Sequence, residues 1–198
     1  MTDVVEALLA GEPVLLPTDT VYGLAVTADR PEPTERMYRL KGRDPLKPSA
    51  LLTADVETLL ELVPELRGRA DIIARVLLPG PYTLILPNPA RRYGWITGPA
   101  PEAIGVRVPA LPEAARAVVE AAGGVVATSA NRSGGPDPRR LDDVPREIRE
   151  NVAAEIDAGE LPGTPSTVLD FTGAEPKVVR EGAARADEAL ARVAAALR

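Results

Sequence analysis

The chain has 198 residues, of which 45% are hydrophobic and 26% are charged, and its formal net charge is −6. This balance is typical of a globular protein and excludes a wholly disordered chain. Cysteine and histidine are both absent, which excludes disulfide bonds, Cys/His metal sites, thiol nucleophiles and Ser-His-Asp triads. Any chemistry must therefore come from Lys, Arg, hydroxyl, amide and carboxylate groups and from the backbone.

The length predicts a single domain over residues 1–198, with a core over about residues 4–182 and a closing helix over 186–198. The longest apolar runs, 4–10 and 82–87, are far too short to span a membrane. The start Met1-Thr2-Asp3 carries an acid where an export signal needs bases. We therefore expect a cytoplasmic protein with no membrane contact.

Hydrophobic periodicity and turn residues predict alternating helices and strands. In the first half we expect helices over 4–10, 34–40, 56–63 and 66–78, and strands over 14–16, 22–26 and 50–52. In the second half we expect strands over 82–86, 104–108, 125–128, 166–170 and 177–180, and helices over 112–122 and 186–197. Asp55 is expected to cap the helix over 56–63. The alternation predicts an α/β fold with an open, twisted, mixed sheet flanked by helices.

The segment 17–23, Pro-Thr-Asp-Thr-Val-Tyr-Gly, follows the first predicted strand, where α/β proteins commonly place ligand-binding loops. Thr18, Asp19 and Thr20 offer three side chains that form hydrogen bonds. The alternative is a plain turn, in which Asp or Thr binds the local backbone.

Lys41, Arg43 and Lys47 lie on a loop broken by glycine and proline after a predicted helix. Such cations can hold a polyphosphate and stabilise the charge that develops during phosphoryl transfer. A solvated charged loop is the alternative. Neither a Walker A sequence nor a GxGxxG motif occurs, so a nucleotide site here would be unorthodox.

Small polar residues and paired glycines follow the strand predicted over 125–128. They expose backbone N–H groups to an anion or a base, or form a flexible turn. Arg107 lies within an apolar strand and needs a partner, either an internal carboxylate or a ligand. The carboxylates between 142 and 150 are interpreted as a solvated acidic face.

Six segments, in this order along the chain, resemble the YrdC family, the threonylcarbamoyl-AMP synthases of transfer-RNA modification. The segments are 17–24, 41–43, 79–86, 106–109, 128–134 and 166–170. The resemblance covers roughly residues 4–182 and implies an open, twisted α/β fold with a concave, positively charged cavity. It is closest to the short, single-domain form, because only an Ala-rich helix follows Gly182.

The resemblance implies a reaction in which L-threonine, bicarbonate or CO₂, and ATP give threonylcarbamoyl-AMP and pyrophosphate. Mg²⁺ would accompany ATP, with no metal ligand on the protein. A tRNA threonylcarbamoyl transferase would receive the product, and direct tRNA binding would be weak. The implied site residues are Lys41 and Arg43 for catalysis, Arg43, Lys47, Ser129, Asn131 and Arg180 for the nucleotide, and Thr20, Arg107 and Ser166 for threonine.

Besides the missing C-terminal extension of the longer members, the chain departs from the family pattern at one position. Many longer members place a histidine shortly after the Lys-x-Arg loop, where this chain has about Leu52. The carboxylate of threonine would then rely on Arg107 and on hydroxyl groups.

Two other functions stay open. The first is a non-catalytic RNA-binding module, against which the acidity and the 3% aromatic content speak. The second is a carbamoyl-AMP-forming domain, as in hydrogenase-maturation proteins, which carry zinc-finger parts that need cysteines.

Overall fold

The computed structural model describes residues 2–198, and in this range nine strands form one sheet in the order β7-β1-β2-β6-β3-β5-β4-β8-β9. Parallel and antiparallel pairs are mixed within it, as predicted. The strands are β1 Val14–Pro17, β2 Tyr22–Thr27, β3 Ala50–Leu52, β4 Tyr82–Pro87, β5 Ala103–Arg107, β6 Val125–Ser129, β7 Ala154–Glu155, β8 Thr167–Asp170 and β9 Lys177–Arg180.

The helices are α1 Thr2–Ala10, α2 Pro31–Lys41, α3 Val56–Leu62, α4 Arg69–Leu77, α5 Glu113–Ala122, α6 Arg146–Arg149 and α7 Ala186–Ala196, with a 3₁₀ turn η1 at Leu141–Asp143. Asp55 caps α3 as predicted, because its side chain accepts a hydrogen bond from Thr58 N. In the described part of the chain, every helix is too short or too polar to cross a bilayer.

Two predicted helix starts were wrong. Helix α2 begins at Pro31, three residues before the predicted start at 34, because proline is well suited to the first helical turn, where its missing N–H costs nothing. Helix α4 begins at Arg69 rather than at 66. Gly68 has a φ of +57°, a left-handed value that lies outside a right-handed helix.

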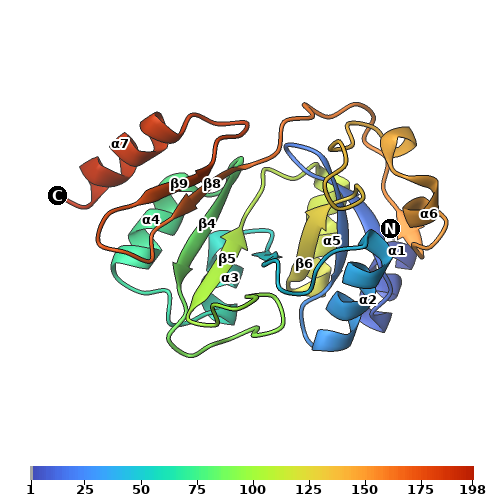
Figure 1. Cartoon of the computed structure of the whole chain (residues 1–198), viewed down its shortest axis with the longest axis horizontal. Coiled ribbons are helices and arrows are strands. Elements are labelled where there is room, and N and C mark those ends of the chain that lie inside the picture. The colour runs from blue at the N-terminus through green and yellow to red at the C-terminus, as the bar shows by residue number, and fades with distance from the viewer. Residues whose placement is uncertain (1) are drawn as a thin grey trace.

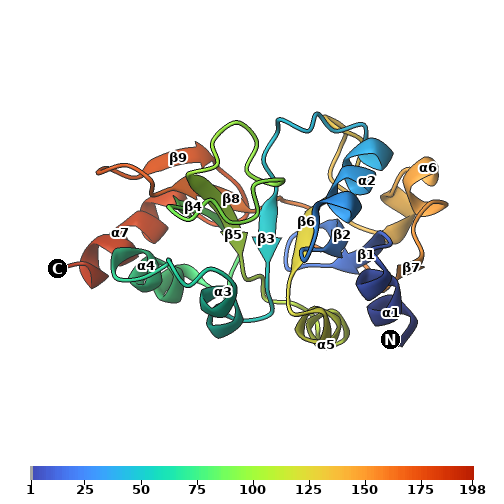
Figure 2. The same ribbon diagram turned by 90° about the horizontal axis from the view of Figure 1, so that it is seen from below.

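The two faces of the sheet pack differently along its length. On one face, Leu24 packs with α2, while Leu84 and Val106 pack with α3, α4 and α7. On the other face, Val14 and Ala25 pack with α1 and α5. Figure 2 shows α2 on one side of the twisted sheet and α1 and α5 on the other. Leu52 at the end of β3 still packs in the cluster with α5, whereas in the described part of the chain no helix packs on this second face over β5, β4 and β8.

A linker over residues 156–166 connects β7 to β8 and so crosses from one half of the molecule to the other (Figure 1). Hydrogen bonds to Tyr22 of β2 and to Thr20 of the β1–β2 loop hold it in place. The Tyr22 hydroxyl accepts a hydrogen bond of 2.9 Å from Ala158 N, and Gly163 N donates to Thr20 O at 2.8 Å. These contacts fix the position of the linker and therefore of the start of β8, which follows it.

Candidate functional site

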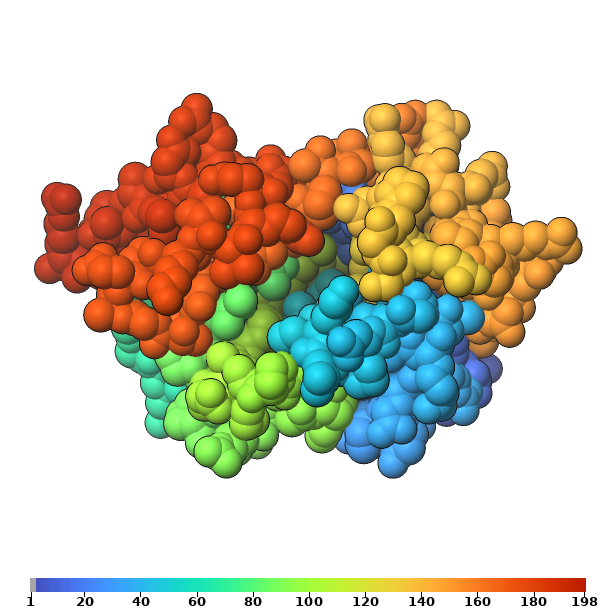
Figure 3. All heavy atoms as spheres, in the orientation of Figure 1, coloured from blue at the N-terminus to red at the C-terminus, as the bar shows by residue number. Residues whose placement is uncertain are grey.

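A cavity of about 730 Å³ opens on the second face of the sheet, beyond the part that α1 and α5 cover. Figure 3 shows a hollow near the centre of the view, between the orange-red C-terminal segment and the yellow segment that follows β6. The lining comes from the β1–β2 loop, the loop after α2, the β4–β5 loop, the linker, and strands β3, β4, β5, β6, β8 and β9. Segments far apart in the sequence thus meet at one place.

The floor of the cavity is one row of residues paired across five strands. The row runs through Ala127, Ala50, Gly105, Ile85 and Asp170. Since side chains alternate between the faces of a sheet, the residues between these positions point into the core on the other side. Three of the five are alanine or glycine, so the floor leaves room for a ligand.

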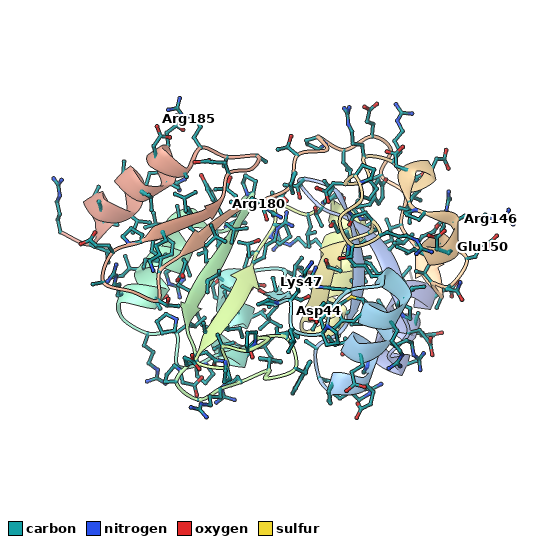
Figure 4. All side chains as sticks on the ribbon, viewed as in Figure 1. Asp44, Lys47, Arg146, Glu150, Arg180 and Arg185 are labelled. Carbon is teal, nitrogen blue, oxygen red and sulfur yellow. The ribbon has the colours of Figure 1, made fainter. Side chains whose placement is uncertain are left out.

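Three guanidinium groups and two carboxylates line the cavity, so the lining has one positive charge in excess. They belong to Arg43, Arg107, Arg180, Glu102 and Asp170. Arg43 leaves the loop after α2, and its Nη2 donates to Pro48 O at 2.5 Å. Burial lowers the pKa of Arg43, but an arginine side chain remains charged at neutral pH. Figure 4 shows Arg180 and Lys47 near the centre of the molecule.

Lys41, the last residue of α2, is only 3% exposed. Its Nζ donates to Asn131 Oδ1 at 2.6 Å and also to Ser129 O. The Ser129 hydroxyl donates to the same Asn131 oxygen at 2.7 Å. Burial lowers the pKa of Lys41 to about 8, and the charge of Arg43 adds to this effect. Ser129 lines the cavity, so this network places the lysine charge directly behind the wall.

Arg107 projects from β5, and its Nη2 donates to Asp19 Oδ1 at 2.5 Å and to Thr20 Oγ1 at 2.7 Å. The sequence left open whether Arg107 pairs with an internal carboxylate or with a ligand. In the structure it pairs with the carboxylate of Asp19, and it also lines the cavity. The local turn also forms, because Thr18 Oγ1 accepts from Thr20 N and Val21 N. The segment 17–23 therefore forms the local turn and also lies beside the cavity, so both alternatives offered by the sequence apply to it.

Arg180 and Ser166 also line the cavity. Arg180 Nη2 donates to Ser166 O at 2.7 Å, and Ser166 Oγ shares a hydrogen bond of 2.8 Å with Thr83 Oγ1. The charge of Arg180 contributes to lowering the pKa of Arg107, after burial. Asp19 is the one carboxylate paired with Arg107 among the described residues, so the added charge of Arg180 favours an anion in the cavity.

Most of the predicted site residues lie at this one cavity, some in its lining and others buried behind the lining. Arg43, Arg107, Ser129, Ser166 and Arg180 line it. Thr20, Lys41 and Asn131 are buried directly behind the lining through their hydrogen bonds to Arg107 and Ser129.

Lys47 is exposed on the loop beside Arg43 and is not part of the lining formed by residues 2–198. Leu52, near which the resemblance implies a histidine in longer family members, is buried and does line the cavity. Sequence reasoning missed the partnership of Asp19 with Arg107 and the whole floor. The period-2 alternation of small and apolar residues over Ala103–Val106 of β5 was a signal for part of the floor.

Comparison with known proteins gives one consistent family. The model of the Sua5/YciO/YrdC family, described as telomere recombination, matches residues 6–182. A threonylcarbamoyl-AMP synthase of Pyrococcus abyssi is 34% identical over 87% of this chain, which spans only 51% of that relative. A threonylcarbamoyl-AMP synthase of Alkalilimnicola ehrlichii is 38% identical over 88% of this chain and 86% of its own length.

A solved structure shows the same fold. The structure of P. abyssi Sua5 complexed with L-threonine superposes with a TM-score of 0.82 at 31% identity. The match covers 96% of this chain and 55% of that one. The chain therefore spans about half the length of the P. abyssi protein and most of the length of the A. ehrlichii protein.

Proposed function

Because this chain belongs to the Sua5/YciO/YrdC family, we propose that it is an L-threonylcarbamoyladenylate synthase. It would convert L-threonine, bicarbonate or CO₂, and ATP to threonylcarbamoyl-AMP and pyrophosphate. The observation that carries the proposal is the single cavity around which Arg43, Arg107, Arg180 and the Lys41–Ser129–Asn131 network gather. The names of the relatives and the L-threonine complex of P. abyssi Sua5 support it.

The chemistry suits a chain without histidine or cysteine. The threonine amine and CO₂ or bicarbonate form a carbamate without an enzymic nucleophile. A carbamate oxygen then attacks the α-phosphorus of ATP in line, a new P–O bond forms, and the bond to the leaving pyrophosphate breaks. The protein has to position the reactants and offset negative charge on the phosphate oxygens and on pyrophosphate.

The geometry suggests that different residues of the cavity bind threonine and the phosphates of ATP. Arg107 and the hydroxyl of Ser166 would bind the carboxylate of threonine, with Thr20 holding Arg107 from behind. Arg43 and Arg180 would face the phosphates together with Ser129. Lys41 would add its charge through Ser129 and Asn131, and the exposed Lys47 would reach the triphosphate from the loop.

Mg²⁺ would enter as part of the nucleotide substrate. Among residues 2–198, no group of three or more acidic side chains could hold a metal ion, and the cavity carboxylates Glu102 and Asp170 are only two. A metal bound mainly by ATP phosphates is consistent with the reluctance of Mg²⁺ to lose its water ligands. We also propose that the protein acts in the cytoplasm and passes its product to a tRNA threonylcarbamoyl transferase.

The surface offers little to support the RNA-binding alternative. Five arginines between positions 132 and 149 are each paired with a carboxylate, so they form no patch of free positive charge. They are Arg132, Arg139, Arg140, Arg146 and Arg149. Tight, steeply salt-dependent binding of tRNA without ATP turnover would favour that alternative.

The test is pyrophosphate release in the presence of ATP, bicarbonate and one amino acid at a time. We expect release that depends on L-threonine and exceeds the rate with serine. ATP turnover with carbamoyl phosphate but without threonine would instead identify a carbamoyl-AMP-forming domain.

A charge variant ties the activity to the cavity. We expect Arg43→Gln to lower kcat/KM by about 100-fold or more, because a cation facing transition-state charge contributes several kcal/mol. Arg146→Gln is the matched control, since it makes the same change in charge at an 86% exposed side chain on the outside of the molecule (Figure 4). Equal activity of the two variants would contradict the assignment of Arg43.

A further inference from the structure

Asp19 lies in the β1–β2 loop, but its side chain plays no part in the turn of that loop. The Thr18 hydroxyl closes the turn by accepting from Thr20 N at 3.2 Å and Val21 N at 3.3 Å and donating to Val21 O at 2.7 Å. Such a hydroxyl is sufficient for a local turn. The carboxylate of Asp19 is therefore used elsewhere.

Both oxygens of this carboxylate make contacts with distant parts of the chain. Oδ1 accepts from Arg107 Nη2 at 2.5 Å, and Oδ2 accepts from Ala110 N at 3.0 Å. Strands β2, β6 and β3 lie between β1 and β5 in the sheet, so the contact joins two separate parts of the cavity wall. The side chains of Arg107 and Asp19 are only 12% and 11% exposed.

The surroundings make Arg107 depend on this partner. Burial is the main cause that lowers the pKa of Arg107, the nearby charge of Arg180 adds to it, and Asp19 opposes both. The Nε of Arg107 is buried and has no hydrogen-bond partner among residues 2–198. A buried guanidinium without its carboxylate would be strongly destabilised, and Arg107 would move away from its place in the wall.

We propose that Asp19 is a positioning residue for the amino-acid substrate, which it never touches. Asp19 binds Arg107 through Nη2 alone. It therefore holds the guanidinium group in the cavity wall and leaves the other nitrogen atoms of the group for a substrate carboxylate. This inference rests on the proposed function, because it assumes that threonine is the ligand of Arg107.

The experiment compares Asp19→Asn, Asp19→Glu and Asp55→Ala in the pyrophosphate assay. Asp19→Asn keeps the shape but removes the charge, so we expect the KM for L-threonine to rise about tenfold or more, as for the loss of a charged hydrogen bond. We expect kcat to change less than about threefold, and the KM for ATP less than about twofold, because the phosphates lie on other residues. Asp19→Glu restores the carboxylate and should lower the KM for threonine again.

Asp55→Ala is the stability control. It removes the N-cap of α3, a hydrogen bond of 2.7 Å to Thr58 N, and Asp55 is not among the residues that line the cavity. A merely structural role of Asp19 would give Asp19→Asn the same kinetic profile as Asp55→Ala, which would overturn the inference. Calorimetric titration with L-threonine should show the same weakening for Asp19→Asn without any turnover.

The outcomes separate the inference from the function on which it rests. A wild-type protein that releases pyrophosphate with threonine, combined with an unchanged threonine KM in Asp19→Asn, overturns only the role of Asp19. A wild-type protein that neither binds threonine nor releases pyrophosphate overturns the proposed function, and the positioning role with it.

Discussion

Lys41 illustrates how the surroundings of one residue set its chemistry. As the last residue of α2 it lies where the helix dipole favours a cation, and its Nζ donates a hydrogen bond of 2.6 Å to Asn131 Oδ1. Burial works against the charge and lowers the pKa of Lys41 to about 8, below its ordinary value of 10.5. The lysine is therefore charged at neutral pH, but at a cost in stability.

This cost predicts a pH dependence of stability. In the unfolded chain Lys41 keeps its proton up to about pH 10.5, and in the folded chain only up to about 8. The unfolded state thus binds more protons between these values, so the free energy of unfolding should rise with pH across this window. In Lys41→Met this rise should be smaller by roughly 2–4 kcal/mol. Urea unfolding of both proteins from about pH 7.5 to about pH 10.5 measures the difference; parallel curves would contradict it.

At the same scale, the sequence indicated that Arg107 needs a negatively charged partner, but it did not identify that partner. A charge within the apolar strand 104–108 is visible in the sequence, whereas Asp19 lies 88 residues away. The pairing depends on the register of β5 and on the position of the β1–β2 loop, which are long-range properties. Residue types that carry chemistry were therefore predictable here, and their mutual contacts were not.

At the scale of elements, the strands were predicted to within about two residues because each is a short apolar run between turn residues. The segment 141–155 was not predicted: η1, α6 and β7 are too short to show a period. Its carboxylates between 142 and 150 were interpreted as a solvated face, and their exposure agrees with this. Asp142, Glu147 and Glu150 are 90%, 45% and 56% exposed, and each also pairs with an arginine.

Gly182, just after β9, packs closely against the backbone of the linker beside the cavity. A Cβ atom at this position would lie 2.3 Å from Pro165 O and 2.6 Å from Ser166 O, which are backbone atoms of the linker. Gly182→Ala should therefore push β9 away from the linker and disturb the bond from Arg180 to Ser166 O. We expect a loss of roughly 1–3 kcal/mol in the free energy of unfolding, as for overpacking, together with weaker substrate binding.

The control for this prediction is Gly94→Ala, whose Cβ would meet no atom closer than 4.0 Å. Chemical denaturation and the pyrophosphate assay would be applied to both variants. If Gly182→Ala is as stable and as active as Gly94→Ala, the close contact between β9 and the linker does not position Arg180.

At the scale of the whole molecule, the twist of the sheet creates the binding face. Among the described residues, the face that α1 and α5 cover at β1 and β2 is free of helices at β5, β4 and β8. The linker carries the chain over to β8 on the far side of the sheet (Figure 1). The sequence predicted the strands, but their order in the sheet, and therefore the position of the cavity, depends on pairings between distant segments.

The small residues of the floor should then decide whether ligands fit at all. Ala127 of β6 pairs with Ala50 of β3 and lines the cavity. Ala127→Leu would place three further carbon atoms in the cavity without changing the core on the other face of the sheet. We expect KM for ATP or threonine to rise by more than about tenfold, a loss of roughly 1.4 kcal/mol in binding, while the melting temperature changes by no more than about 2 °C.

Ala117→Leu provides the matched control, since it adds the same carbon atoms at an exposed position of α5. Differential scanning calorimetry separates the two explanations of an inactive Ala127→Leu protein. An unchanged melting temperature with lost threonine binding means that the cavity has been filled. If Ala127→Leu keeps wild-type KM values, the row of small residues across β6, β3 and β5 is not the floor on which the substrates lie.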